Sequence, residues 1–275
     1  MTVDGADADA RAELRELAAG LRAHLEYLGM TGATGVPRGE TAPAGAVPPP
    51  APRVPQPGLS TEPQAAKPPA LEPKAPPGPT LEPEERARRL TVLAETVKGC
   101  TRCALAGGRT QTVFARGTGS SRLMFVGEGP GADEDAQGFP FVGKAGQLLD
   151  RMIVAMGFAR DDVYVANIVK CRPPNNRKPE PEEMAACLPY LAEQIELIAP
   201  EVIVALGATA VQGLFGTGEG IMRIRGRWRL YNGRIPVMPT FHPAYLLRTP
   251  AAKREVWDDL QAVLRQMGRV APSRG

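Results

Sequence analysis

The chain has 275 residues, of which 43% are hydrophobic and only 5% are aromatic, and this length accommodates one large domain or two small ones. No segment approaches the run of about 20 apolar residues that a membrane span requires, and the N-terminus lacks a signal-peptide pattern, so we expect a cytoplasmic protein without a membrane partner. The net charge of +3 is uneven, because residues 1–85 carry 7 basic and 12 acidic side chains and residues 86–275 carry 26 and 18; the basic part suits a polyanionic partner, although charge alone fits an ordinary basic domain equally well.

The N-terminal 30 residues predict one short amphipathic helix. Five leucines repeat there at spacings of three and four, which places them on one helical face: Leu14, Leu17, Leu21, Leu25 and Leu28. Residues 31–83 hold 16 prolines and few large apolar residues, so they cannot bury enough surface to offset the entropy of ordering. We expect a disordered linker that tethers a helix able to dock on a protein partner.

Residues 84–268 predict one folded domain, followed by a tail at 269–275. Helices are expected at 84–98, 147–156, 181–198, 208–215 and 251–267. Strands are expected at 123–126, 163–167 and 202–206, as a pair within 227–238 around the turn Asn232-Gly233, and once more before "PTFHPAYLLR". Strands that are apolar on both faces and alternate with helices predict a three-layer α/β/α fold with a mainly parallel sheet.

Four cysteines all lie in this domain: Cys100, Cys103, Cys171 and Cys187. Thiols stay reduced in the cytosol, and a C-x2-C pair with two further cysteines supplies enough ligands for tetrahedral zinc or a [4Fe–4S] cluster. Buried thiols without a metal are the alternative. The pattern favours a metal site, and its spacing does not distinguish zinc from iron–sulfur.

Polar residues gather at the predicted carboxyl ends of the strands, where ligands bind in parallel sheets. The loop Gly127–Gly146 reads "GEGPGADEDAQGFPFVGKAG" and lacks the Lys-Ser/Thr of a phosphate-binding P-loop. Carboxylates beside backbone N–H groups suit a site that recognises a neutral polar ring. They equally suit a site that positions water and stabilises a cationic transition state. Asn167 and His242 end two other strands, and Leu246-Leu247 with Arg248 could wedge a base step and contact phosphate.

Arginines at alternate positions form a second basic feature: Arg223, Arg225, Arg227 and Arg229. On a strand, alternate side chains point to one side, so the series predicts a row of guanidinium groups on one face. Contact with a DNA backbone and a charged edge strand that resists aggregation are equally compatible with this pattern.

The loop at Gly127–Gly146, "NIVKCRPPNNRKP" and "PTFHPAYLLR", together with the cysteines, resemble a type-four uracil-DNA glycosylase of the iron–sulfur branch. The resemblance covers roughly residues 84–267. It implies the uracil-DNA glycosylase fold in a monomer that flips uracil out of single- or double-stranded DNA and hydrolyses its N-glycosidic bond. The resulting abasic site starts base excision repair.

The resemblance also implies roles for individual residues of the predicted uracil pocket. Backbone groups near Glu128 and Gly129 bind a uracil carbonyl, and Phe141 stacks on the ring. Asn167 reads O4 and N3–H, because an amide offers both a donor and an acceptor. His242 donates to O2 as the bond breaks.

Further matches concern catalysis and the cluster. Glu134 and Asn176 match positions associated with catalysis, and the sequence does not separate their roles. The chain carries Ala132 where some members have an acid. The four cysteines match the family's [4Fe–4S] ligands, and Leu246 and Arg248 remain the predicted DNA contacts.

Two rival functions are less well supported by the sequence. A non-catalytic or covalent uracil-binding relative would carry a basic, histidine-containing insertion after the third cysteine, whereas "RPPNNRKPEP" has no histidine. A redox or DNA-sensing module would not need Phe141, Asn167 and His242 together.

Overall fold

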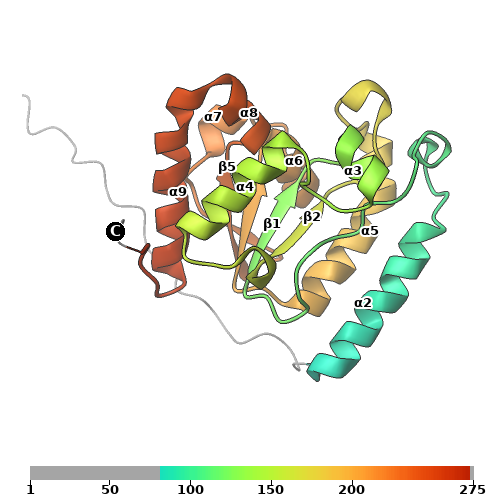
Figure 1. Ribbon diagram of the computed structural model, residues 1–275, viewed down its shortest axis with the longest axis horizontal. Helices are drawn as coiled ribbons and strands as arrows, with labels where there is room; N and C mark the ends of the chain where they lie inside the picture. The colour runs from blue at the N-terminus through green and yellow to red at the C-terminus, as the bar shows by residue number, and fades with distance from the viewer. Residues whose placement is uncertain (1–80, 273–275) are drawn as a thin grey trace, which may run out of the picture. The chain divides into compact units, whose positions relative to one another are not determined.

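The computed structural model of the protein describes residues 81–272, which form a five-stranded sheet with helices on both faces (Figure 1). The predicted helix at 14–28 and nearly all of the predicted linker at 31–83 lie outside the described residues. None of the helices described between 81 and 272 is long and apolar enough to cross a membrane.

The strands are β1 (Leu123–Gly127), β2 (Tyr164–Asn167), β3 (Val202–Leu206), β4 (Arg229–Tyr231) and β5 (Ile235–Thr240). The α-helices are α2 (Pro83–Lys98), α3 (Ala132–Gln137), α4 (Lys144–Ala155), α5 (Pro181–Ile198), α6 (Ala208–Phe215), α7 (Ile221–Ile224), α8 (Pro243–Arg248) and α9 (Lys253–Gln266). The 3-10 turns are η1 (Ala104–Gly107), η2 (Arg160–Asp162), η3 (Pro174–Asn176) and η4 (Pro250–Ala252).

The sheet is parallel except at one edge. Its order is β2-β1-β3-β5-β4, and only β4 runs antiparallel, paired with β5. The pairs Gly127↔Asn167 and Leu206↔Thr240 align the ends of four strands. The residues that follow β1, β2, β3 and β5 therefore share one edge of the sheet, as the predicted site requires.

Each face of the sheet carries its own hydrophobic core. Side chains alternate along a strand, so Met124 and Val126 pack on the side of α2, α5 and α6, while Leu123 and Phe125 pack on the side of α4 and α9. Figure 1 shows α2 beside α5 on one face and α4 with α9 on the other. The predicted three-layer α/β/α fold with a mainly parallel sheet is confirmed.

Several predicted elements coincide with the structure, and the differences are local. The bounds of α5, β3 and α6 match the predictions, while α4 begins three residues earlier, at Lys144. The strand expected before "PTFHPAYLLR" is β5 itself, so no further strand exists there. The helices α3, α7 and α8 were not predicted, because segments of four to six residues are too short to show a helical period.

The prediction of four arginines on one strand face is wrong. Arg223 belongs to α7, and only Arg229 lies in a strand. Arg225 turns inward, where it donates to Asp259 at 2.8 Å, and Arg229 pairs with Glu219. The glycine at 226, in the left-handed region at φ 70°, breaks the extended backbone on which the alternation argument depended.

Candidate functional site

Asn167 lies at the end of β2 with its side chain 1% exposed. The amide oxygen Oδ1 is buried and has no hydrogen-bond partner among the described residues. A buried, unpaired polar atom is costly, so it marks a place where a ligand completes the hydrogen bonding. Asn167 therefore presents a fixed acceptor to whatever enters the space beside it.

Phe141 forms an aromatic wall next to this amide. An added methyl at Gly127 would overlap the amide oxygen of Asn167 and would lie 2.6 Å from Cζ of Phe141, so both side chains converge on Gly127. The backbone of Phe141 is held at φ 58°, a region that costs free energy for a bulky residue and persists only where the surroundings enforce it.

Glu134 holds the loop that carries Phe141. Its Oε1 accepts from the N–H groups of Val142 and Gly143, both at 2.9 Å, and its Oε2 accepts from the N–H of Gly131 at 3.0 Å. A carboxylate with three backbone donors fixes the start of α3 against the start of α4. The structure thus gives Glu134 a positioning role, and its predicted part in catalysis stays a prediction.

His242 ends the connection after β5 and caps the N-terminus of α8. Its Nδ1 accepts from the N–H of Ala244 at 3.2 Å, so in the neutral ring Nε2 carries the proton. Its ring lies 5.6 Å from that of Phe141, centroid to centroid. Burial, reinforced by the positive charge of Arg248, lowers the pKa of His242 to about 4. At neutral pH His242 is therefore an uncharged donor through Nε2.

The turn after β1 supplies backbone donors at the same edge. In the described part of the chain, the N–H groups of Glu128 and Gly129 donate no hydrogen bond. A methyl at Gly129 would lie 2.7 Å from the side chain of Val169, so the close approach requires glycine. The carboxylate of Glu128 accepts from the hydroxyl of Thr209 on α6. The predicted pocket residues after β1, β2 and β5 are therefore brought to one edge of the sheet.

Other predicted residues lie outside this convergence. Asn176 is exposed on η3, where its amide oxygen accepts from Arg172 at 2.8 Å, so its catalytic role stays a prediction. Leu246 is 1% exposed and packs in the core, and its predicted DNA contact stays a prediction. Leu247, 44% exposed, is the apolar side chain that α8 presents to solvent, and Arg248 beside it is also exposed.

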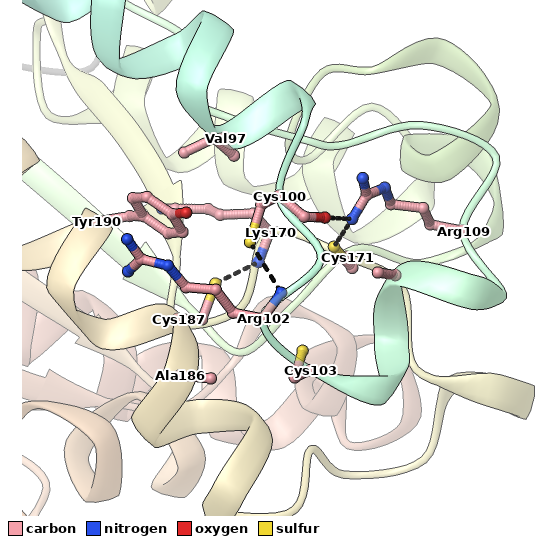
Figure 2. Close-up of a pocket in the computed structure, with 11 residues that line it drawn as sticks. Val97, Cys100, Arg102, Cys103, Arg109, Lys170, Cys171, Ala186, Cys187 and Tyr190 are labelled. Carbon is pink, nitrogen blue, oxygen red and sulfur yellow. Dashed lines mark hydrogen bonds between the residues drawn. The ribbon is translucent and has the colours of Figure 1, made fainter.

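A second feature is a cavity lined by all four cysteines (Figure 2). It is open to solvent and lies where the loop after α2 meets α5. Cys100 and Cys103 come from that loop, Cys171 follows β2, and Cys187 projects from α5. Residues separated by up to 87 positions in sequence therefore face one hollow.

The cavity is positively charged around its sulfur atoms. Arg109 donates to the sulfur of Cys171 at 3.2 Å and to the carbonyl of Cys100 at 2.7 Å. Arg102 stacks over the ring of Tyr190, 4.6 Å from its centroid. Burial raises the pKa of Cys187 to about 11, so this thiol is protonated at neutral pH unless a metal displaces the proton.

The arrangement of the four thiols bears on whether they could hold a metal. Among the described residues, no three Cys, His, Asp or Glu side chains converge closely enough to hold one metal ion. The four thiols nevertheless line one cavity, and four thiolates are a donor set for either tetrahedral zinc or a [4Fe–4S] cluster.

Two residues of this region were missed by the sequence analysis. Lys170 is fully buried between Asn167 and the cysteines, and Gln194 on α5 is equally buried beside it. A lysine that ends the apolar run "NIVK" directly before a candidate ligand was the available signal, since isolated lysines are almost never fully buried. Gln194 left no comparable signal in its helix.

Comparisons with known proteins agree with this geometry. The family described as "Uracil DNA glycosylase superfamily" matches residues 114–261. A type-4 uracil-DNA glycosylase of Thermotoga maritima is 48% identical over 179 residues, which cover 64% of this chain and 93% of the relative. The type-4 enzyme of Saccharolobus solfataricus is 42% identical, over 63% of this chain and 84% of the relative. That of Archaeoglobus fulgidus is 38% identical, over 66% of this chain and 94% of the relative. The chain therefore belongs to the uracil-DNA glycosylase superfamily and, within it, to the type-4 enzymes.

Proposed function

We infer that this protein is a DNA glycosylase that binds uracil flipped out of DNA, hydrolyses its N-glycosidic bond and leaves an abasic site. The observation that carries the proposal is the unpaired, buried Oδ1 of Asn167 beside the ring of Phe141. A flat ring that stacks on Phe141 and donates to Oδ1 satisfies both features at once. The family relationship supports the same reaction.

The amide of Asn167 explains why uracil would be chosen over cytosine. Uracil offers an N3–H donor to Oδ1 and an O4 acceptor to Nδ2, whereas cytosine presents the reverse pattern along that edge. A buried amide that is fixed in place leaves its own groups unpaired when the wrong base enters, which is the stronger form of discrimination. Phe141 adds stacking that does not depend on sequence.

His242 and the turn after β1 would stabilise the departing base. Negative charge develops on uracil as the N1–C1′ bond breaks, while the sugar becomes an oxocarbenium-like cation that water then attacks. The Nε2–H of neutral His242 donates to O2, and the N–H groups of Glu128 and Gly129 are available to a uracil carbonyl. Donors that are already in place before the reaction require no reorganisation, which makes them effective.

We further propose that Cys100, Cys103, Cys171 and Cys187 hold a [4Fe–4S] cluster. The four thiols around one cavity and the cationic side chains beside them suit an anionic cluster. A cluster bound there ties α2 and η1 to α5 and to the segment after β2, so its role at this site is structural support. Single- or double-stranded uracil-containing DNA is the proposed partner, and the proposed functional form is a monomer.

The direct test is single-turnover excision from a uracil-containing oligonucleotide, read as strand breaks after alkali. The wild-type protein should cleave at uracil and leave matched cytosine and thymine strands intact. Asn167→Asp should slow uracil excision by about 100-fold or more, because an ionised carboxylate cannot donate to O4. Iron and sulfide analysis of the same preparation tests the cluster.

The possible outcomes separate the candidate functions. A protein that binds uracil-containing DNA without producing alkali-labile sites would be a non-catalytic relative. If the Asn167→Asp variant excises uracil at the wild-type rate, the amide of Asn167 does not recognise the base. Stoichiometric zinc without iron after anaerobic purification would contradict the [4Fe–4S] assignment while leaving excision untouched.

A further inference from the structure

Among residues 81–272, no anionic side chain pairs with the buried ammonium group of Lys170. Its Nζ donates to the carbonyl oxygen of Asn167 at 2.8 Å and to Oε1 of Gln194 at 2.5 Å. Both acceptors are neutral, and no carboxylate pairs with Lys170 in the described part of the chain. An ammonium has three donors, so two neutral acceptors satisfy neither its hydrogen bonding nor its charge.

The proposed cluster would bring negative charge into the cavity that Lys170 lines. Lys170 lines the same cavity as all four cysteines (Figure 2), and its backbone N–H donates to the sulfur of Cys187 at 3.3 Å. Four thiolates around a [4Fe–4S] core give the centre a net negative charge. A buried cation next to such a centre gains the partner that the surrounding protein does not provide.

The other side of Lys170 reaches the uracil pocket. Its ammonium holds the main-chain carbonyl of Asn167, whose side chain is the proposed uracil reader. Gln194 extends the contact by donating to the hydroxyl of Tyr164 at 3.0 Å and to the carbonyl of Phe114 at 3.2 Å. The end of β2 is thus held by a buried polar network of Lys170, Gln194 and Tyr164. The same lysine contacts Cys187 through its backbone N–H.

We propose that Lys170 is the internal counter-ion of the cluster and a positioning residue for Asn167, so that the bound cluster sets the geometry of uracil recognition. This inference rests on the proposed cluster and the proposed excision activity. Lys170 does not touch uracil. Its ammonium stays in place only while the anionic centre balances its positive charge. In that position it holds Asn167, the proposed uracil reader, at the end of β2.

The first test is cluster release from the iron-loaded protein. Lys170→Met removes the charge at nearly constant length, and chelator-driven loss of iron should become about 10- to 100-fold faster, as for other residues that support metal ligands. Lys178→Met is the matched control, because Lys178 also donates to a glutamine, Gln212, but on the surface; its rate should equal that of wild type. Gln194→Met removes a neutral partner only and should not accelerate release.

Two further readouts distinguish a counter-ion from a hydrogen-bonding residue. The midpoint potential of the cluster should become more negative in Lys170→Met, because loss of a nearby cation disfavours the reduced state, and should stay unchanged in Gln194→Met and Lys178→Met. Single-turnover excision should fall about tenfold in Lys170→Met. The same substitution in an Asn167→Ala background should have almost no further effect, since Lys170 acts through that residue.

The outcomes are decisive in each direction. Unchanged iron release and potential in Lys170→Met, or equal acceleration in Gln194→Met, would overturn the counter-ion role. Additive losses with Asn167→Ala would overturn the positioning role. A wild-type protein without iron or excision would instead refute the proposed function. If Lys170→Met does not fold, hydrogen exchange in the wild type decides: removing iron should increase exchange at residues 164–170, and unchanged exchange would overturn the proposal.

Discussion

His242 illustrates how much a single residue depends on its surroundings. Its Nδ1 is occupied by the backbone of α8, which leaves Nε2–H as the donor, and burial with the nearby charge of Arg248 lowers its pKa to about 4. The ring is therefore neutral across the physiological range, although an exposed histidine titrates near 6.5. A neutral donor suits a departing uracil anion, since it does not have to give up a proton.

The pH dependence of excision follows from this pKa. Protonation of His242 breaks the cap at Ala244, so the single-turnover rate at saturating enzyme should stay flat as pH falls through 6.5 and decline only toward about 4. The folded pKa lies below the unfolded one, so the associated stability is present above pH 6.5 and is lost between 6.5 and about 4.

Arg248→Gln provides the control for this profile. Removing the positive charge should raise the pKa of His242 and move the acidic limb to higher pH, while the plateau rate stays close to that of wild type. If the excision rate instead falls near pH 6.5 in both the wild type and Arg248→Gln, a group other than His242 controls the reaction.

Gly127 is the second position where one residue decides the site. A methyl there would overlap Oδ1 of Asn167 and crowd Cζ of Phe141. Gly127→Ala should therefore displace the reader and slow excision by about 100-fold, the usual cost of a misplacement of about 1 Å. Gly220→Ala is the matched control, because a methyl at Gly220 meets nothing within 4 Å and its φ is −68°. Equal rates in the two variants would show that the pocket tolerates the displacement.

At the scale of elements, short connections carry the function and long elements carry the fold. The helix α3 and the loop to α4 are organised by one carboxylate, Glu134, that accepts from three backbone N–H groups. The helix α8 is begun by His242 itself. Both elements are six residues long and owe their position to these caps more than to intrinsic helix propensity.

The junction of α7, β5 and α9 depends on an ion pair whose carboxylate is buried and whose arginine is partly buried. Arg225 donates to Oδ1 of Asp259 at 2.8 Å, and the hydroxyl of Thr240 donates to Oδ2 at 2.6 Å. Arg225→Gln leaves the buried carboxylate of Asp259 without its cation, so the free energy of unfolding should fall by about 3–5 kcal/mol. Chemical denaturation measures this loss.

Arg223→Gln is the control for this element, because Arg223 is exposed on α7 and should change the free energy of unfolding by less than about 0.5 kcal/mol. Both substitutions remove one positive charge. If Arg225→Gln instead keeps its stability and mainly flattens the salt dependence of DNA binding, the surface role originally predicted for this arginine would be correct.

At the scale of the whole molecule, the type-4 relatives match only part of the chain. The Thermotoga maritima enzyme matches 179 residues of this chain over 93% of its own length, so a type-4 enzyme needs little beyond the matched region. Residues 1–80 contain none of the matched motifs. They carry 7 basic and 9 acidic side chains, whereas residues 86–275 are basic.

Deletion of residues 1–80 should therefore leave single-turnover uracil excision nearly unchanged. Removal of a net negative segment should raise DNA affinity at low salt and steepen the fall of log K with log salt. Titration of uracil-containing duplex at several salt concentrations measures both effects. A large loss of excision in the truncated protein would indicate that these residues complete the folded domain.

The sequence by itself determined the architecture and the placement of several candidate pocket residues at strand ends. Apolar strands that alternate with helices leave a covered parallel sheet as the stable arrangement, and the ends of such strands must meet at one edge. Asn167 and His242 drew attention because they lie at the predicted carboxyl ends of strands, and the cysteines because of their C-x2-C spacing. The roles proposed for them came from the family resemblance.

Tertiary structure alone decided which groups are buried, paired or free. The alternating arginines predict a strand from sequence alone, but Gly226, in the left-handed region, interrupts the extended backbone. Arg225 instead pairs with the carboxylate of Asp259, 34 residues away in sequence. Leu246 and Leu247 are equivalent in sequence, and only the packing of α8 buries the first and exposes the second. Lys170 became informative for the same reason: that no anionic side chain of residues 81–272 pairs with it is a property of its three-dimensional surroundings, which no local pattern encodes.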